Sequence, residues 1–184
     1  MANKERKIRN KEVNLLLAVR RRKENPEGQT RCHRHVMDTE DYDLEVKVLK
    51  GMINEPGVWR IYKTINKRST LKAVKLMQHK LIDDPDINET YISTWKTCLL
   101  QTECKAERNV LIDIDTQEKS VQKIVIDLLP VPLIEVQSTP NGMHFVAPKF
   151  DRKAFMDEIN RLGIKDIEVK PDAYVFREIF EYER

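Results

Sequence analysis

The order of apolar segments in the second half of the chain constrains the fold most strongly. Four short runs have the composition of β-strands: NVLIDID (109–115), PLIEVQS (132–138), MHFVAP (143–148) and KDIEVK (165–170). Amphipathic segments follow the first and third runs, at residues 117–129 and 152–163, and Asp151 is placed to cap the second of these helices. The predicted order is therefore β-α-β-β-α-β.

This order builds an antiparallel sheet with two helices on one face, as in ferredoxin-like and RNA-recognition (RRM) folds. We therefore predict an α+β chain with an RRM/ferredoxin-like β-α-β-β-α-β core over residues 106–184. Residues 1–105 also alternate predicted strands and helices, and we expect them to form an N-terminal α/β extension that packs on this core. A length of 184 residues suits one compact domain overall.

Acidic residues and a histidine fall at the ends of three predicted strands. Asp113 and Asp115 end the first strand, His144 begins the third, and Asp166 and Glu168 begin the fourth. In the predicted topology the first strand lies between the third and fourth and runs antiparallel to both, so these ends meet at one edge. Strand alternation places Asp113, His144 and Glu168 on the face opposite the helices. The sequence thus predicts a site at this edge of the sheet.

The residue types at this edge suit a divalent cation and a phosphorylated substrate. Mg²⁺ prefers one or two carboxylates together with water and substrate phosphates, which Asp113 and Asp115 can supply. A third acid on a neighbouring strand would complete a site for one or two metal ions. The histidine is placed to hydrogen-bond a phosphate, and Lys149, Arg152 and Lys170 are expected to add positive charge.

Three segments resemble the motifs of the archaeo-eukaryotic primase superfamily, especially its primase-polymerase branch. The segments are NVLIDIDTQEK, QSTPNGMHFVAP and DIEVKPDAYVF, and together they cover roughly residues 109–176. The family has a DxD motif after an apolar strand, which Asp113 and Asp115 match. Its second motif places a histidine after a small residue, often within a TPxGG-x-H turn, and His144 matches it within the turn at residues 139–142.

The third family motif is an apolar residue followed by an acid. The best-aligned position is Glu168 after Ile167, although the family usually has aspartate there. Asp166 and Asp172 are the nearby substitutes. Glutamate is longer than aspartate, so the metal geometry would have to adjust.

The resemblance implies template-dependent, metal-dependent nucleotidyl transfer. Asp113, Asp115 and Glu168 would hold Mg²⁺ or Mn²⁺, and His144 would contact the phosphates of the incoming nucleotide. The 3′-hydroxyl of a primer, or of an initiating nucleotide, would attack the α-phosphate. The implied partners are a nucleic-acid template, nucleoside triphosphates and replication proteins such as a helicase.

A segment upstream of the core extends the resemblance more loosely. Residues 59–68 (WRIYKTINKR) are similar to the strand and polar turn that precede the core in some family members. This similarity would place Asn66 and Arg68 near the nucleotide or the template.

Charge and hydropathy add two expectations. The first 23 residues contain nine lysines and arginines against Glu5 and Glu12, which suits either contact with a phosphate backbone or a solvated chain end. No apolar run approaches the roughly 20 residues that span a bilayer, so we expect no membrane partner and a cytoplasmic protein.

The main alternative is a catalytically inactive nucleic-acid-binding or interaction protein on the same fold, for example from a phage or mobile element. RRM modules bind RNA through aromatic residues on the open face of the sheet. Here the residues predicted on that face are Leu111, Asp113, Asp115, His144 and Val146. Such an acidic face repels phosphate unless a metal ion neutralises it, which favours the metal-dependent reading.

Overall fold

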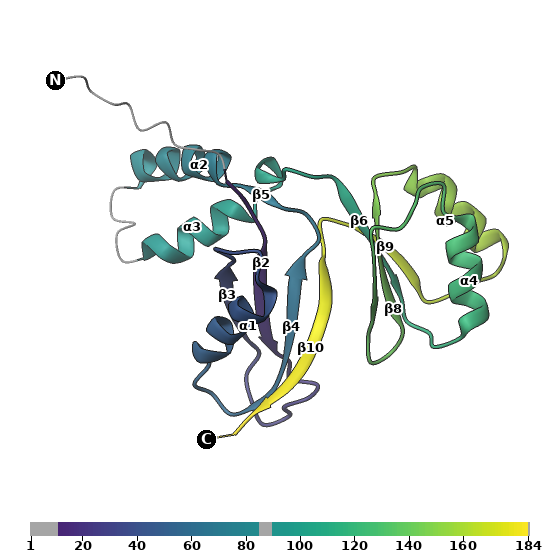
Figure 1. Cartoon of the computed structure of the whole chain (residues 1–184), viewed down its shortest axis with the longest axis horizontal. Coiled ribbons are helices and arrows are strands. Elements are labelled where there is room, and N and C mark those ends of the chain that lie inside the picture. Colours follow the sequence, from purple (N-terminus) through teal and green to yellow (C-terminus); the bar gives the residue numbers. More distant parts are fainter. Residues whose placement is uncertain (1–10, 85–89, 184) are drawn as a thin grey trace.

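The computed structural model describes residues 11–84 and 90–183 of the chain. Within these ranges it contains two four-stranded antiparallel sheets, a two-stranded ladder and five α-helices. The two larger sheets lie side by side, and each packs against its own helices (Figure 1). The predicted α+β class is therefore confirmed. No helix in this part of the chain is long and apolar enough to cross a membrane.

The N-terminal sheet has the strand order β10-β4-β2-β3. Its strands are β2 (Leu15–Arg20), β3 (Arg31–Val36), β4 (Gly57–Thr64) and β10 (Tyr174–Tyr182), and a separate ladder pairs β1 (Glu12–Val13) with β5 (Arg68–Ser69). The helices of this half are α1 (Tyr42–Gly51), α2 (Thr70–Asp83) and α3 (Tyr91–Leu99). The turn η2 (Thr102–Cys104) then leads toward the second sheet.

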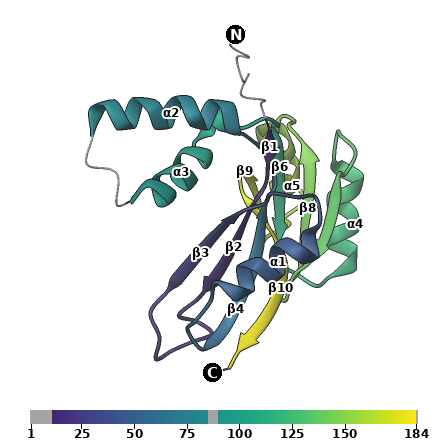
Figure 2. The same ribbon diagram turned by 60° about the vertical axis from the view of Figure 1, so that its left-hand side comes forward.

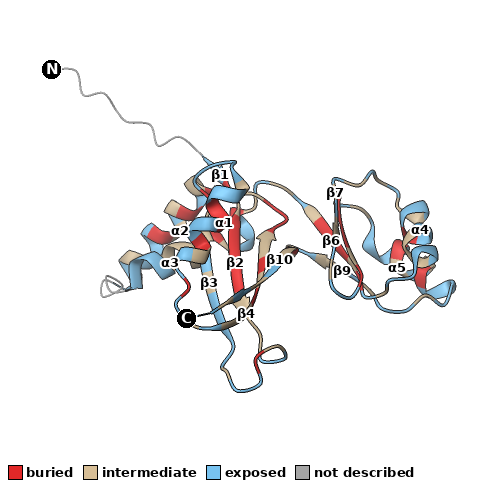
Figure 3. Ribbon diagram, turned by 60° about the horizontal axis from the view of Figure 1, so that its bottom comes forward, coloured by how far each residue is buried: buried red, intermediate tan, exposed pale blue. Residues whose placement is uncertain are grey.

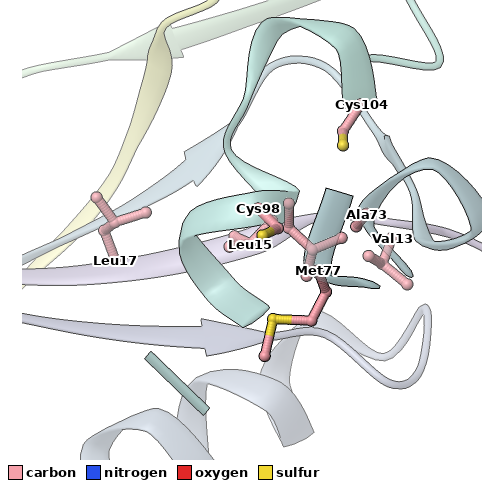
Figure 4. Packing of buried hydrophobic residues seen from close by; sticks show 8 residues of the cluster. Val13, Leu15, Leu17, Ala73, Met77, Cys98 and Cys104 are labelled. Atoms are coloured by element: carbon pink, nitrogen blue, oxygen red, sulfur yellow. The ribbon is translucent and has the colours of Figure 1, made fainter. Parts of the chain in front are cut away.

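Strand β2 forms the centre of this half because both of its faces are covered. Leu16 packs with Leu49 of α1 on one face, and α1 lies across the strands in Figure 2. Leu15 and Leu17 on the other face pack with Met77 of α2 and with α3 (Figure 4). A strand buried on both faces needs an unbroken apolar run rather than alternation, which explains the sequence LLLA in β2.

The C-terminal sheet has the strand order β7-β8-β6-β9 and is antiparallel throughout. Its elements are β6 (Asn109–Ile114), α4 (Lys119–Leu128), β7 (Glu135–Ser138), β8 (Met143–Pro148), α5 (Arg152–Arg161) and β9 (Ile167–Pro171). The central position of β6 between β8 and β9 agrees with the prediction. Val110, Ile112 and Ile114 pack with Val125 of α4 and Phe155 of α5, so the predicted facing of β6 is also confirmed.

Strand β10 departs from the predicted division of the chain at residue 105. After β9 the chain turns and β10 pairs with β4 along its whole length, so the last strand belongs to the N-terminal sheet. The start of β10 lies against the open face of the C-terminal sheet, where Val175 packs with Leu111, Val146 and Ile65. Figure 3 shows buried residues along β2 and β6, which are inner strands of the two sheets. Residues 106–184 therefore do not form a separate unit. Their last strand completes the N-terminal sheet, and the start of that strand covers the open face of the C-terminal sheet.

Two buried polar contacts join the halves. The Asn66 side-chain NH₂ donates to the Asn109 carbonyl over 3.1 Å, and the Asn109 N–H donates to Oδ1 of Asn66 over 2.6 Å. The guanidinium of Arg68, which is 2% exposed, pairs with the carboxylate of Asp172, whose φ is 65°. These contacts correct the expected nucleotide role of Asn66 and Arg68, since both side chains are used inside the junction. They also direct Asp172 toward Arg68 and away from the predicted metal site.

Candidate functional site

The end of β6 and the start of β8 bring the predicted acid and histidine together. Asp113 is the register partner of His144 on β8 and of Glu168 on β9. Nε2 of His144 lies 3.2 Å from Oδ1 of Asp113. The expected convergence on the open face of the sheet is therefore observed for these two side chains.

Strand β10 holds His144 from the other side. The Phe176 N–H donates to Nδ1 of His144 over 3.0 Å, and Phe176 lies next to a β-bulge in which Arg177 has no register partner on β4. Because Nδ1 accepts this hydrogen bond, the proton of the neutral imidazole is on Nε2, the nitrogen nearest Asp113. His144 is only 8% exposed. The backbone of β10 therefore fixes both the position and the tautomer of the ring.

Lys170 on β9 contacts the second oxygen of Asp113. Its Nζ lies 2.7 Å from Oδ2 of Asp113 and 3.0 Å from Oε2 of Glu168. Lys170 was predicted to supply positive charge at this site, and it does lie there. Glu168 is also present, but its side chain is 69% exposed and pairs with Lys170. Both carboxylate oxygens of Asp113 thus have cationic or N–H partners.

These partners keep Asp113 ionised. They lower its pKa from the usual 3.8 to about 2: the hydrogen bond from His144 is the largest cause, burial opposes it, and the hydrogen bond from Lys170 adds to it. A depression of this size stabilises the folded protein by about 2 kcal/mol at neutral pH. The site therefore presents a carboxylate, not a carboxylic acid, over the physiological pH range.

The turn before His144 is pressed against the end of β6. The Thr139 N–H donates to the Gly142 carbonyl over 2.9 Å, and the Gly142 N–H donates to Oγ1 of Thr139 over 3.0 Å. A Cβ atom on Gly142 would overlap the carbonyl oxygen of Ile114 and crowd the N–H of Thr116. Only glycine permits this approach of one backbone to another. The turn thus sets the start of β8 directly beside the end of β6.

A cavity of about 440 Å³ lies over Asp113 and His144, between the two sheets. This volume is in the range of small-molecule sites, roughly 300–1,000 Å³. Residues from both halves line it: Arg21, Lys23, Arg60, Tyr62, Asp113, Asp115, Thr139, Pro140, Asn141, His144, Lys170 and Phe176. The cavity therefore combines two acids with four cationic side chains.

The N-terminal half also contributes side chains to this cavity, and the sequence indicates only some of them. Arg21 and Lys23 belong to the basic segment noted in the sequence, of which residues 1–10 lie outside the described residues. Arg60 and Tyr62 were not predicted, although alternation along β4 places them opposite the buried Trp59 and Ile61. Arg60 is positioned by Glu24, whose Oε1 lies 2.6 Å from Nη2 of Arg60. No local pattern shows that this face of β4 meets β6.

Of the predicted acids, Asp113 and Asp115 line the cavity, whereas Asp166, Glu168 and Asp172 do not. Asp115 is exposed and lines it, and its N–H donates to the carbonyl of Asp166, whose φ is 61°. Among the described residues, no group of three or more His, Cys, Asp or Glu side chains is arranged to hold a metal ion. Asp113 and Asp115 are the two carboxylates that reach the cavity, and an oxygen pair of this kind suits Mg²⁺ or Mn²⁺ when substrate phosphates supply further ligands.

Lys149 and Arg152 do not lie at this site, contrary to expectation. In the β6–β8 register Asp113 faces His144, whereas Asn109 faces Pro148, the residue before Lys149. Four residues along a strand separate the two ends by roughly 13 Å. The reason is the direction of β8, which starts at the site with His144 and carries the chain away from it.

Comparisons with known proteins add no assignment. No protein-family model, no curated protein and no solved structure matches the chain.

The pH dependence of stability tests the ion-pair network of Asp113. Because the folded-state pKa of Asp113 is depressed, its contribution is present above about pH 4 and is lost as the pH falls toward 2. Asp113→Asn is expected to lower the free energy of unfolding by about 2 kcal/mol at pH 6 and progressively less below pH 4. Urea unfolding at several pH values measures this difference. Asp157→Asn, which removes an exposed carboxylate of α5, is the control, and an equal pH profile for both variants would contradict the network.

Gly142→Ala tests the contact between the turn and β6. The added methyl group would overlap the Ile114 carbonyl, so we expect a loss of roughly 1–3 kcal/mol in the free energy of unfolding. Gly51→Ala is the matched control because a Cβ atom there meets nothing within 4 Å. Thermal unfolding compares the two variants. A Gly142→Ala protein as stable as the control would show that the turn does not press on β6.

Proposed function

We propose that the chain is a metal-dependent nucleotidyltransferase of the primase-polymerase type, which adds nucleotides to a primer or an initiating nucleotide on a nucleic-acid template. The observation that carries this proposal is the contact of Asp113 with His144 in a cavity that also contains Asp115 and four cationic side chains. Ionised carboxylates beside a cluster of lysines and arginines suit a substrate that is a polyphosphate bound with a divalent cation.

The fold supports the same proposal. The element order β6-α4-β7-β8-α5-β9 and the strand order β7-β8-β6-β9 agree with an RRM-like core. The open face of this core is not an aromatic platform of the kind that binds RNA in RRM modules. It has Asp113 and His144 at one end and the apolar cluster of Leu111, Val146 and Val175 in the middle.

The proposed roles follow from the position of each group. Asp113 and Asp115 would hold Mg²⁺ or Mn²⁺, and the ion would supply neutralisation of the triphosphate charge and polarisation of its α-phosphorus. Glu168 is the third acid of the resemblance and lies next to Asp113 in the register, with Asp166 nearby. Lys170 bridges Asp113 and Glu168, so its transfer to Glu168 alone would free one oxygen of Asp113 for the cation.

His144 and the basic residues of the cavity are proposed to bind the phosphates of the incoming nucleotide. Nδ1 of His144 accepts the Phe176 N–H, so the ring offers a proton only from Nε2. In the free protein this proton is directed at Oδ1 of Asp113, and it would pass to a phosphate oxygen once a cation binds that carboxylate. Arg21, Lys23 and Arg60 bind the remaining phosphate charge. The primer 3′-hydroxyl loses its proton to solvent water as its oxygen forms a bond to the α-phosphorus. The bond from that phosphorus to the bridging oxygen breaks, and pyrophosphate leaves with the electron pair.

One observation favours a second candidate, a catalytically inactive nucleic-acid-binding or interaction protein. Asp113 already pairs with both Lys170 and His144, and these partners can replace a metal ion by neutralising the carboxylate. In that case the site stabilises the junction between the sheets and performs no chemistry. The two candidates differ in whether loss of Asp113 and Asp115 abolishes an activity or only lowers stability.

Primer extension tests the proposed activity. Purified protein is incubated with a labelled primer on a single-stranded template, nucleoside triphosphates and Mg²⁺ or Mn²⁺. We expect extension that Asp113→Asn, Asp115→Asn and His144→Ala each reduce by at least about 100-fold, the usual scale for groups that act in the transition state. Template alone, with no primer, tests whether the protein also starts chains.

Asp157→Asn again provides the control, because this exposed aspartate on α5 lies outside the cavity. Its extension rate should match that of the wild-type protein. The absence of any product with either metal, from protein whose folding is verified by circular dichroism, would contradict the enzymatic proposal and favour the inactive candidate.

A further inference from the structure

A second concave surface lies at the opposite end of the C-terminal sheet from His144. It has a volume of about 570 Å³ and is lined by residues of α2, η2, the start of β6 and the connection between β8 and α5. Its lining residues are Lys72, Thr102, Glu103, Lys105, Arg108, Asn109, Val110, Lys149, Arg152, Pro171 and Asp172. We refer to this surface as the basic groove. Five cationic side chains line it against two acidic ones, so it is strongly positive.

The cationic side chains of the basic groove are mostly uncompensated. Asp172 is paired with Arg68 and also approaches Lys105, so its charge is already neutralised from within the protein. Arg108, Lys149 and Arg152 are exposed, and none of them has an ion-pair partner among the described residues. Like charges gathered in one concavity repel one another, and an anionic ligand would remove that repulsion.

The two halves of the protein each provide one wall. Lys72 comes from α2, and Lys105 and Arg108 come from the connection to β6. Lys149 and Arg152 come from the connection between β8 and α5 on the other side. Charges on two facing walls suit a ligand that carries a series of anionic groups along its length, whereas a single small anion would neutralise only part of the groove.

The basic groove is separate from the cavity over Asp113. The apolar cluster of Ile65, Leu111, Val146 and Val175 fills the open face of the sheet between them. The register places the groove at Asn109 and the acidic site at Asp113, roughly 13 Å apart along β6. A substitution in the groove therefore leaves the contacts of Asp113 and His144 in place.

We propose that the basic groove binds the phosphate backbone of a nucleic-acid strand and so anchors the template or the primer outside the nucleotide cavity. This inference rests on the proposed function for the identity of the strand, but not for the existence of the groove. At about 3.4 Å of rise per nucleotide in one strand, the 13 Å separation corresponds to roughly four nucleotides. A strand held in the groove would thus have to extend over about four nucleotides to reach the acids, so the proposed ligand is an oligonucleotide and not a single nucleotide.

Fluorescence anisotropy with a labelled 20-nucleotide single strand tests the groove. Lys149→Glu combined with Arg152→Glu is expected to weaken binding by at least about 10-fold, and to lower the slope of log affinity against log salt by about 1.4, since each phosphate contact contributes about 0.7. Lys119→Glu combined with Lys123→Glu is the matched control, because it makes the same change in net charge on the exposed surface of α4. This control should retain near wild-type binding.

A second pair of substitutions tests the opposite wall. Lys72→Glu combined with Arg108→Glu should weaken oligonucleotide binding to a similar degree. Agreement between the two pairs would show that the loss of affinity does not come from a folding defect in the first pair. Binding of a nucleoside triphosphate, measured by calorimetry, should stay unchanged in both. If triphosphate binding falls with oligonucleotide binding, the groove takes a free nucleotide and the strand proposal is overturned.

The remaining outcomes separate this inference from the proposed function. If both groove variants extend primers and bind the oligonucleotide with wild-type affinity, the proposal that the groove binds a strand is overturned, while the proposed activity stands. Oligonucleotide binding that the groove variants weaken, without any primer extension, would support the groove and contradict the enzymatic proposal. The groove proposal is also overturned if the wild-type protein does not bind the oligonucleotide at low salt. The same holds if the control variant loses as much affinity as the groove variants.

Discussion

His144 is the point at which the two sheets of this protein are joined at the candidate site. One ring nitrogen contacts Asp113 of the C-terminal sheet, and the other accepts the N–H of Phe176 from a strand of the N-terminal sheet. A buried imidazole needs partners for both nitrogens, so the site depends on β10 leaving β9 and returning to β4. The same return creates the cavity, because it places Arg60 and Tyr62 opposite Asp113.

Strand β6 organises charge along the junction. Its C-terminal end carries the acids, its middle is covered by the apolar cluster around Leu111, and its N-terminal end opens into the basic groove. Asn66 and Arg68 lie beside that groove and link the halves, since their partners Asn109 and Asp172 line it. The proposed chemistry and the proposed anchoring of a strand are thus assigned to opposite ends of one strand, separated by a dry contact that keeps them independent.

The sequence predicted the local arrangement of the C-terminal sheet well and the junction poorly. Alternation in β6 and β8 is enough to place Asp113 beside His144, because the register of a sheet with one buried face follows from its apolar pattern. The return of β10 to β4 has no comparable local signal, so Phe176 and Arg60 were missed. Lys149 and Arg152 are close to His144 in sequence but lie at the other end of the sheet, because β8 carries the chain away from the site. Asn66 and Arg68 are polar residues in a turn whose burial depends on contacts with distant residues.

Anomalous scattering from Mn²⁺ in crystals grown with a non-hydrolysable nucleoside triphosphate tests the central claim most directly. The account predicts a manganese peak bound by the carboxylates of Asp113 and Asp115, the triphosphate in the cavity with one oxygen near Nε2 of His144, and Lys170 moved from Asp113 toward Glu168. Manganese and nucleotide bound elsewhere, with Asp113 still paired to Lys170 and His144, would contradict it.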